Sequence, residues 1–193
     1  MRLLVEMLRS HTGSPLSFDA LGREVGLAAN TVRVYIDILE ALHVVFLVRP
    51  YHRNVARALA KSPKLYFFDW ADVVDAKDPS PESGARYENL VASHLLKHTQ
   101  YLTDSEGASV QLLYLRTTDG KEVDFVLANE AGEAAHFIEM KVADTKPSSL
   151  LHRAAADHPQ ALATHWVLRT PHAFDAGGIG IRPAAQWLAD PAA

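Results

Sequence analysis

Apolar positions in the first half of the chain follow a helical period and then give way to strand-length runs. Apolar residues recur at helical spacing in residues 1–9, 17–25 and 30–42. Ser17 can cap the second of these helices, and Gly26 allows a sharp turn before the third. Two apolar runs follow, at residues 44–48 and 64–68. Three helices with a glycine turn and two strands are typical of a winged helix-turn-helix domain.

The third predicted helix has one apolar side, for which we expect Val34, Ile38, Leu39 and Leu42. The opposite side would carry polar groups that can read base edges, and cations in the loop between the two strands can bind phosphates. The predicted nucleic-acid contacts are Asn30, Thr31, Arg33, Tyr35, Arg53 and Arg57. A compact docking or spacer domain of the same fold is the alternative interpretation.

The second half of the chain predicts a mixed order of helices and strands. Clustered prolines and acidic residues at 69–83 break regular structure. We therefore expect a winged-helix domain at 1–68, a linker at 69–83 and a second domain at 84–193. The elements predicted for the second domain are a helix at 85–98, a strand at 110–116, strands carrying Asp124 and Glu139, a helix at 148–158, a strand at 165–169 and a helix at 184–188.

Charge and composition separate the two halves further. The net charge is −4, but residues 1–68 carry nine Lys/Arg and five Asp/Glu, whereas the remainder is strongly acidic. This asymmetry predicts two modules with different partners. The absence of cysteine excludes disulfides and thiolate zinc sites, and no apolar run approaches the ~18 residues of a membrane span. We expect a cytoplasmic protein with no membrane partner.

One hairpin in the second half carries the residues with candidate chemistry. Side chains alternate along a strand, so Glu139 and Lys141 share a face. Asp124 comes from the preceding strand, and Glu88 flanks the apolar side of the helix at 85–98. Acidic groups with a neighbouring lysine are what a metal-dependent phosphodiester site needs. The alternative is a weak Glu139–Lys141 pair on a solvated face.

The order helix, three strands, helix, strand resembles the PD-(D/E)XK nuclease superfamily over about residues 84–170. Glu88, Asp124 and Glu139-Met140-Lys141 occupy places that match the family's acidic helix residue, aspartate and (D/E)XK signature. Val123 stands where a proline often precedes the family's aspartate. The resemblance implies an α/β (α+β) chain whose second domain is nuclease-like, with the order αβββαβ.

The same resemblance implies a cofactor and a role for each site residue. Mg²⁺ or Mn²⁺, which prefer oxygen ligands, would be held by Glu88, Asp124 and Glu139. The metal would lower the pKa of a bound water. Lys141 would hold that water or the developing negative charge.

A second resemblance covers nearly the whole chain. The segments SPKLYFFD, GARYENLVASHL and GKEVDFVL…IEMK are similar to recurring motifs in the C-terminal region of bacterial and archaeal AAA-type ATPases. The chain lacks a GxxxxGK[ST] phosphate loop, so ATP would bind only to an ATPase domain outside this sequence. The resemblance and the helical start of the chain predict the C-terminal part of a longer ATPase.

Three functions follow from the sequence. The first is a metal-dependent DNA endonuclease attached to an ATPase. The second is a non-catalytic DNA-binding or docking module that positions or regulates the ATPase domain. The third is a protein-interaction or oligomerisation domain. The expected partners are DNA, the ATPase domain and a second copy of the chain.

Overall fold

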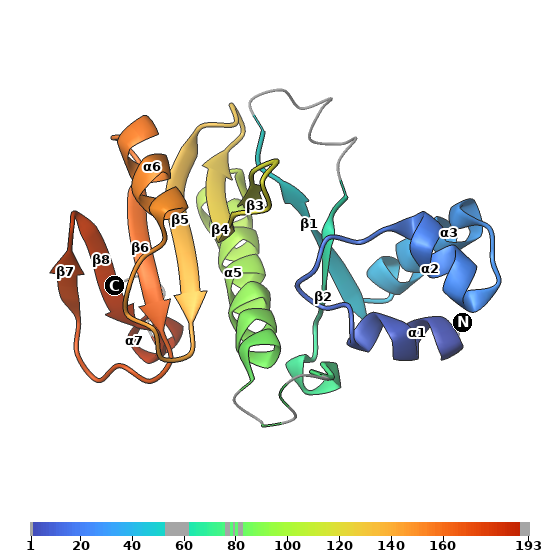
Figure 1. The fold of residues 1–193 in the computed structure, drawn as a ribbon. Helices are drawn as coiled ribbons and strands as arrows, with labels where there is room; N and C mark the ends of the chain where they lie inside the picture. Colours follow the sequence, from blue (N-terminus) through green and yellow to red (C-terminus); the bar gives the residue numbers. More distant parts are fainter. Residues whose placement is uncertain (1, 53–61, 76–77, 79, 81–82, 190–193) are drawn as a thin grey trace. The chain divides into compact units, whose positions relative to one another are not determined.

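A computed structural model of the chain describes residues 2–52, 62–75, 78, 80 and 83–189 (Figure 1). The fold mixes helices and strands, which confirms the predicted α+β class. The chain forms two compact units, one made of Met1–Arg49 with Leu59–Ser93 and the other of Pro50–Ala58 with His94–Ala193. The units therefore divide within one long helix. The sequence predicts domains that end at residue 68 and begin at residue 84. These limits describe parts that would fold independently, and they stay a prediction.

The first unit contains three short helices and an antiparallel pair of strands. Val45 pairs with Phe67, and Val48 pairs with Lys64. The winged-helix assignment stays a prediction, although the order of elements is the one that it requires. The elements are α1 (Arg2–Arg9), α2 (Phe18–Val25), α3 (Ala29–Ala41), β1 (Val45–Pro50), β2 (Lys64–Phe67), the 3-10 turn η1 (Trp70–Asp72) and the beginning of α5 (Gly84–Glu106).

Both ends of α2 are fixed as the sequence predicts. The Ser17 hydroxyl accepts a hydrogen bond from the Ala20 N–H at 3.2 Å, which satisfies a backbone donor of the first turn. Gly26 ends the helix with φ of 70°, a left-handed conformation that residues with a Cβ rarely adopt. The turn that follows brings the backbone of Leu27 against Gly22, whose carbonyl accepts the Leu27 N–H at 2.8 Å.

The prediction for the buried side of α3 was wrong in most positions. Val32, Ile36 and Leu39 face the core, whereas Val34, Ile38 and Leu42 have 54%, 41% and 67% of their surface exposed. Apolar residues occupy two sides of this helix, and both sets follow a helical period. The period alone could not decide which of the two sides packs against α1 and α2.

The predicted nucleic-acid contacts on α3 are in mixed environments. Asn30 and Arg33 are exposed, but the Arg33 guanidinium lies 4.1 Å from the centre of the Phe18 ring. Tyr35 is half-buried and packs against the core, and Thr31 is also half-buried. The other two predicted contacts, Arg53 and Arg57, lie outside the described residues.

The second unit is built on a mixed sheet that α6 covers on one face (Figure 1). Its strands lie in the order β3-β4-β5-β6-β8-β7. Strands β3, β4 and β5 form an antiparallel meander, and β6 runs parallel to β5 and to β8. The elements are β3 (Val110–Arg116), β4 (Glu122–Asn129), β5 (Ala134–Lys141), α6 (Ser149–Asp157), β6 (Leu162–Val167), β7 (Phe174–Ala176), β8 (Ile179–Pro183) and α7 (Ala184–Ala189).

These elements extend the sequence prediction. Tight connections between the first three strands predict an antiparallel meander, and a last strand reached through a helix can run parallel to a neighbour, as the structure shows. The glycine cluster at 177–180 predicts only a turn, so the β7–β8 hairpin was not expected. Among the described residues, no helix is long and apolar enough to cross a membrane.

A bulge in β4 changes which side chains reach the core beneath α6. Leu113 pairs with Val126 but Leu115 pairs with Val123, so β4 holds one more residue than β3 over this interval. As a result, Val123 and Val126 belong to the same buried cluster although they are three residues apart. Simple alternation along a strand predicts Val123 and Phe125 on the same side, and the structure differs because of the bulge.

We expect Gly22→Ala to destabilise the first unit. A Cβ at Gly22 would lie 2.5 Å from the Leu27 carbonyl oxygen, so the α2–α3 turn would have to move. The loss should be about 1–3 kcal/mol, as for other overpacked sites. Thermal and urea denaturation would measure it.

Gly84→Ala is the matched control for that measurement. A Cβ at Gly84, in the first turn of α5, would meet no atom within 4 Å. The stability of the Gly84→Ala variant should equal or slightly exceed that of the unmodified chain. Equal stability of the two variants would contradict the close approach at Gly22.

Candidate functional site

Asp124 lies at the end of the β4–β5 pairing and is fixed to the neighbouring strand. The last regular pair is Phe125 with Ile138, and one further step in the same register places Asp124 opposite Glu139. At this point the Asp124 Oδ2 accepts the backbone N–H of Met140 at 2.7 Å. A charged acceptor on a backbone donor makes a strong hydrogen bond. The sequence-predicted aspartate is therefore fixed to the backbone of the strand that carries Glu139 and Lys141.

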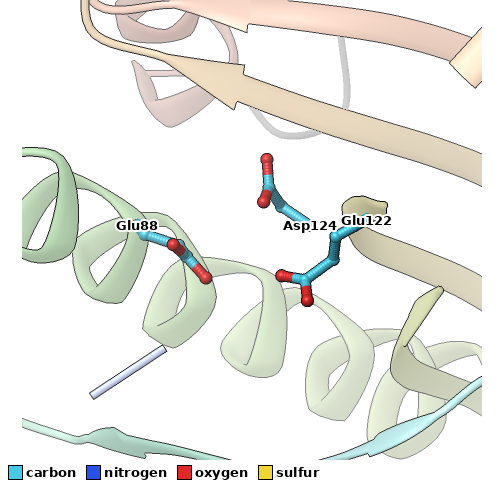
Figure 2. A group of neighbouring side chains, drawn as sticks. All are labelled: Glu88, Glu122 and Asp124. Carbon is cyan, nitrogen blue, oxygen red and sulfur yellow. The ribbon is translucent and has the colours of Figure 1, made fainter. Parts of the chain in front are cut away.

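A second acid on β4 lies beside Asp124. Glu122 and Asp124 offer carboxylate oxygens within 4.8 Å of each other, and both project from β4 in Figure 2. Arg116 on β3 makes an ion pair with the Glu122 Oε2 at 3.0 Å. Two carboxylates at this spacing repel each other, and a cation would relieve the repulsion. The sequence analysis did not include Glu122 among the site residues.

Glu139 is buried at the centre of the sheet, and hydrogen-bond donors hold one of its oxygens. Its side chain is only 4% exposed. The Oε2 accepts the Ser148 backbone N–H at 2.8 Å and lies 3.2 Å from the Nδ1 of the fully buried His165. The other ring nitrogen of His165, Nε2, lies 2.8 Å from the carbonyl oxygen of Asp144. A carbonyl oxygen and a carboxylate oxygen only accept, so both ring nitrogens donate, Nε2 to Asp144 and Nδ1 to Glu139.

These contacts lower the pKa of the Glu139 carboxyl. Burial raises the pKa of its carboxyl, but the hydrogen bonds from His165 and Ser148 and the charge of Lys141 together bring the pKa below its ordinary value of 4.5. Glu139 is therefore ionised at neutral pH despite its burial. Because the Ser148 N–H lies at the start of α6, the same carboxylate also satisfies a backbone donor at that helix end.

Lys141 lies next to Glu139 at the end of β5. Its Nζ is 3.6 Å from the Glu139 Oε1 and donates a hydrogen bond of 2.9 Å to the Met140 carbonyl. The side chain is 42% exposed, so the ammonium group is accessible to a ligand. The two side chains therefore share one face of the strand, as alternation along β5 predicts.

Glu88 belongs to the first unit, whereas Glu122 and Asp124 belong to the second (Figure 2). Within its own unit, the Glu88 Oε1 accepts hydrogen bonds from Lys64 Nζ at 3.0 Å and from the Tyr66 hydroxyl at 2.7 Å. Lys64 is almost fully buried and Glu88 is 22% exposed. The next residue, Asn89, bonds both backbone groups of Phe67 and so fixes α5 against β2. Glu88 therefore has a structural partner of its own in the first unit.

The structure thus brings the predicted residues of the hairpin together only in part. Asp124 contacts the backbone of the strand bearing Glu139, and Glu139 contacts Lys141. However, Glu139 belongs to no group of three acidic or histidine side chains with ligand atoms within 4.8 Å, as far as the described residues extend. The physical reason is that its Oε2 faces His165 and the start of α6.

Lys64, His165 and Ser148 contact the candidate residues but were not among the predicted site residues. Lys64 and His165 are ionisable residues inside otherwise apolar strands, KLYF and HWV, and that contrast was a usable signal. Ser148 was expected to begin a helix, and it does cap α6 by accepting the Leu151 N–H. Its backbone contact with Glu139 had no signal in the sequence, because it depends on how the loop before α6 folds back.

Comparisons with known proteins agree with the two-part organisation of the chain. Residues 1–74 match the family described as a domain of unknown function (DUF8612), and residues 83–175 match another domain of unknown function (DUF4143). Two similar relatives are the uncharacterised proteins Mb2031c of Mycobacterium bovis and Rv2008c of Mycobacterium tuberculosis. Each is 28% identical over 163 residues, which covers 80% of this chain and 35% of the relative. The chain therefore spans about a third of the length of these relatives. No solved structure matches the chain significantly.

His136, on the same strand as Glu139, gives a pH-dependent prediction. Burial lowers the pKa of its ring from 6.5 to about 4, and its Nε2 lies 2.7 Å from the Thr164 hydroxyl. His136 takes up a proton near pH 6.5 in the unfolded chain but only near pH 4 in the folded chain. Stability should therefore fall as the pH decreases through this window.

The His136→Gln variant should lose most of that pH dependence. The difference in unfolding free energy between pH 7 and pH 4 should shrink by on the order of 2 kcal/mol, because one titrating group is removed. Urea denaturation at a series of pH values would measure it. An unchanged slope between pH 6.5 and 4 would contradict the prediction, because it would mean that His136 takes up a proton as readily in the folded chain as in the unfolded chain.

Proposed function

We propose that the chain is part of an AAA-type ATPase and that its second unit is a PD-(D/E)XK nuclease-like domain that hydrolyses DNA phosphodiesters with Mg²⁺ or Mn²⁺. The observation that carries the proposal is the hydrogen bond from the Met140 N–H to Asp124, which joins the aspartate to the strand with Glu139 and Lys141. The order of α5, the meander, α6 and a parallel strand also supports it, because it is the order that the nuclease resemblance implies.

The donor set suits a hard divalent cation. Carboxylate oxygens are the ligands that Mg²⁺ and Mn²⁺ prefer, and Asp124 and Glu122 offer two of them within 4.8 Å of each other. Glu139, opposite Asp124 in the strand register, is proposed as a further ligand. Glu88 is proposed as a further ligand on the strength of the sequence resemblance. A bound metal would supply a water of lowered pKa and would neutralise charge on the phosphate.

Each protein group then has a task. The buried Glu139 is held ionised, so it presents a full negative charge without needing to lose a proton. Asp124 is kept in place by the Met140 N–H. Lys141 is exposed enough to meet a phosphate oxygen, and its ammonium would stabilise the negative charge that develops there.

The test is a nuclease assay on supercoiled plasmid, linear duplex, single-stranded DNA and RNA, each with Mg²⁺ and with Mn²⁺. The unmodified chain should nick or cut DNA, and Asp124→Asn and Lys141→Met should each lower the rate by about a hundredfold or more. Asp119→Asn is the control, because this acid lies in the turn before β4, is exposed and has Lys121 at 3.8 Å as its ion-pair partner. Absence of cleavage of every substrate with both metals would refute the proposal.

A second candidate function is docking to the ATPase part of a longer protein. It is favoured by the apolar row on the outer side of α3, where Val34, Ile38 and Leu42 lie one turn apart and are all exposed. A DNA-reading helix would instead present polar and cationic groups to the groove. In this alternative the outer side of α3 in the first unit would bind the ATPase part.

Fluorescence anisotropy with duplex DNA separates docking from DNA binding. Docking predicts no salt-sensitive DNA binding by the unmodified chain at low ionic strength. It also predicts that Ile38→Ser keeps the fold, because this side chain is exposed, but weakens association with the ATPase part at least tenfold. DNA binding that Arg33→Ala weakens, and that Ile38→Ser leaves intact, would contradict docking.

A further inference from the structure

Glu139 has one oxygen held by two hydrogen-bond donors and one that lies near the partly exposed ammonium group of Lys141. The Oε2 has two partners, the Ser148 N–H at 2.8 Å and the His165 Nδ1 at 3.2 Å. The Oε1 lies 3.6 Å from Lys141 Nζ, which is 42% exposed. The two oxygens of one carboxylate therefore lie in different surroundings.

The His165 ring is itself fixed on both sides. It is fully buried in β6, directly paired with Glu139 across the parallel strands. Its Nε2 donates to the Asp144 carbonyl at 2.8 Å, which holds the plane of the ring and aims Nδ1 at Glu139. Such a contact between a buried donor and an acidic ligand is how proteins orient the first ligands of a metal.

We propose that His165 is a positioning residue that, with the Ser148 N–H, holds the Oε2 of Glu139 and leaves Oε1 as its single ligand atom for the cation. This inference rests on the proposed metal-dependent function and adds the way in which Glu139 binds. Glu139 is then a monodentate ligand. His165 contacts neither the metal nor the substrate.

Substitution of His165 by asparagine or by glutamine tests the contacts of its two ring nitrogens one at a time. An asparagine amide can place its N–H near the position of Nδ1, and a glutamine amide can place its N–H near that of Nε2. His165→Asn therefore keeps the contact with Glu139, whereas His165→Gln keeps only the contact with Asp144. A residue that merely supports the fold through Asp144 would be replaced better by glutamine.

The experiment is calorimetric titration of the full chain with Mn²⁺, with thermal melting of every variant in parallel. We expect His165→Asn to stay within about threefold of the unmodified affinity and His165→Gln to bind about tenfold to a hundredfold more weakly. His136→Asn and His136→Gln are the matched controls. They alter another histidine that links β5 to β6, through Thr164, and neither should change the affinity.

A second pair of variants tests the same inference through the other donor. Ser148→Pro removes the backbone N–H at a residue whose φ of −71° suits proline, and Ser148→Ala removes only the hydroxyl cap. Ser148→Pro should bind Mn²⁺ at least about tenfold more weakly than Ser148→Ala. This comparison decides the matter if His165→Gln does not fold.

The outcomes distinguish the inference from the function on which it rests. Equal Mn²⁺ affinity of His165→Gln and the unmodified chain, or a loss in His165→Asn as large as that in His165→Gln, would overturn the positioning role alone. No Mn²⁺ binding by the unmodified chain, or unchanged binding in Glu139→Gln, would overturn the proposed metal site and the inference with it.

Discussion

The burial of an ionised carboxylate at Glu139 is the constraint on which the second unit depends. A carboxylate removed from water is stable only if donors replace its hydration. Here they come from three places: the ring of His165 on β6, the backbone N–H of Ser148 before α6, and the ammonium of Lys141 on β5. One side chain thereby ties the end of the meander to the parallel strand and to the helix that covers the sheet.

A second acid is fixed at the same end of the hairpin. The antiparallel register of β4 and β5 ends where Asp124 bonds the Met140 N–H, so the side chain replaces a ladder partner at the end of the pairing. The Asp124 carboxylate is thus placed by the backbone of β5 rather than by a mobile loop. Sites built on strands in this way hold their geometry better than sites built on loops.

Much of the second unit could be predicted from the sequence, since its strands are long enough to show their period. The strand 110–116 and the parallel return at β6 followed from pattern and topology alone. The bulge between Val123 and Val126 could not be predicted, because an extra residue in one strand can be recognised only when its pairing with the neighbouring strand is known. The α3 prediction failed for a different reason, since two apolar sides competed for one core.

The sequence suggested Asp124, Glu139 and Lys141 as candidate site residues but not how these side chains are bonded. The types and order of Asp124, Glu139 and Lys141 came from the sequence, whereas the commitment of Glu139 to His165 depends on a contact across 26 residues that no local pattern records. The hydrogen bond from His165 restricts the ways in which Glu139 could bind a cation. An acid whose two oxygens were both exposed could chelate a cation through both atoms or simply remain hydrated. An acid held by one oxygen presents the other at a fixed point, and a fixed point of negative charge beside an accessible lysine is more specific than the ExK pattern itself. The contact with His165 that holds Glu139 within the sheet would therefore also restrict how the proposed site binds a cation.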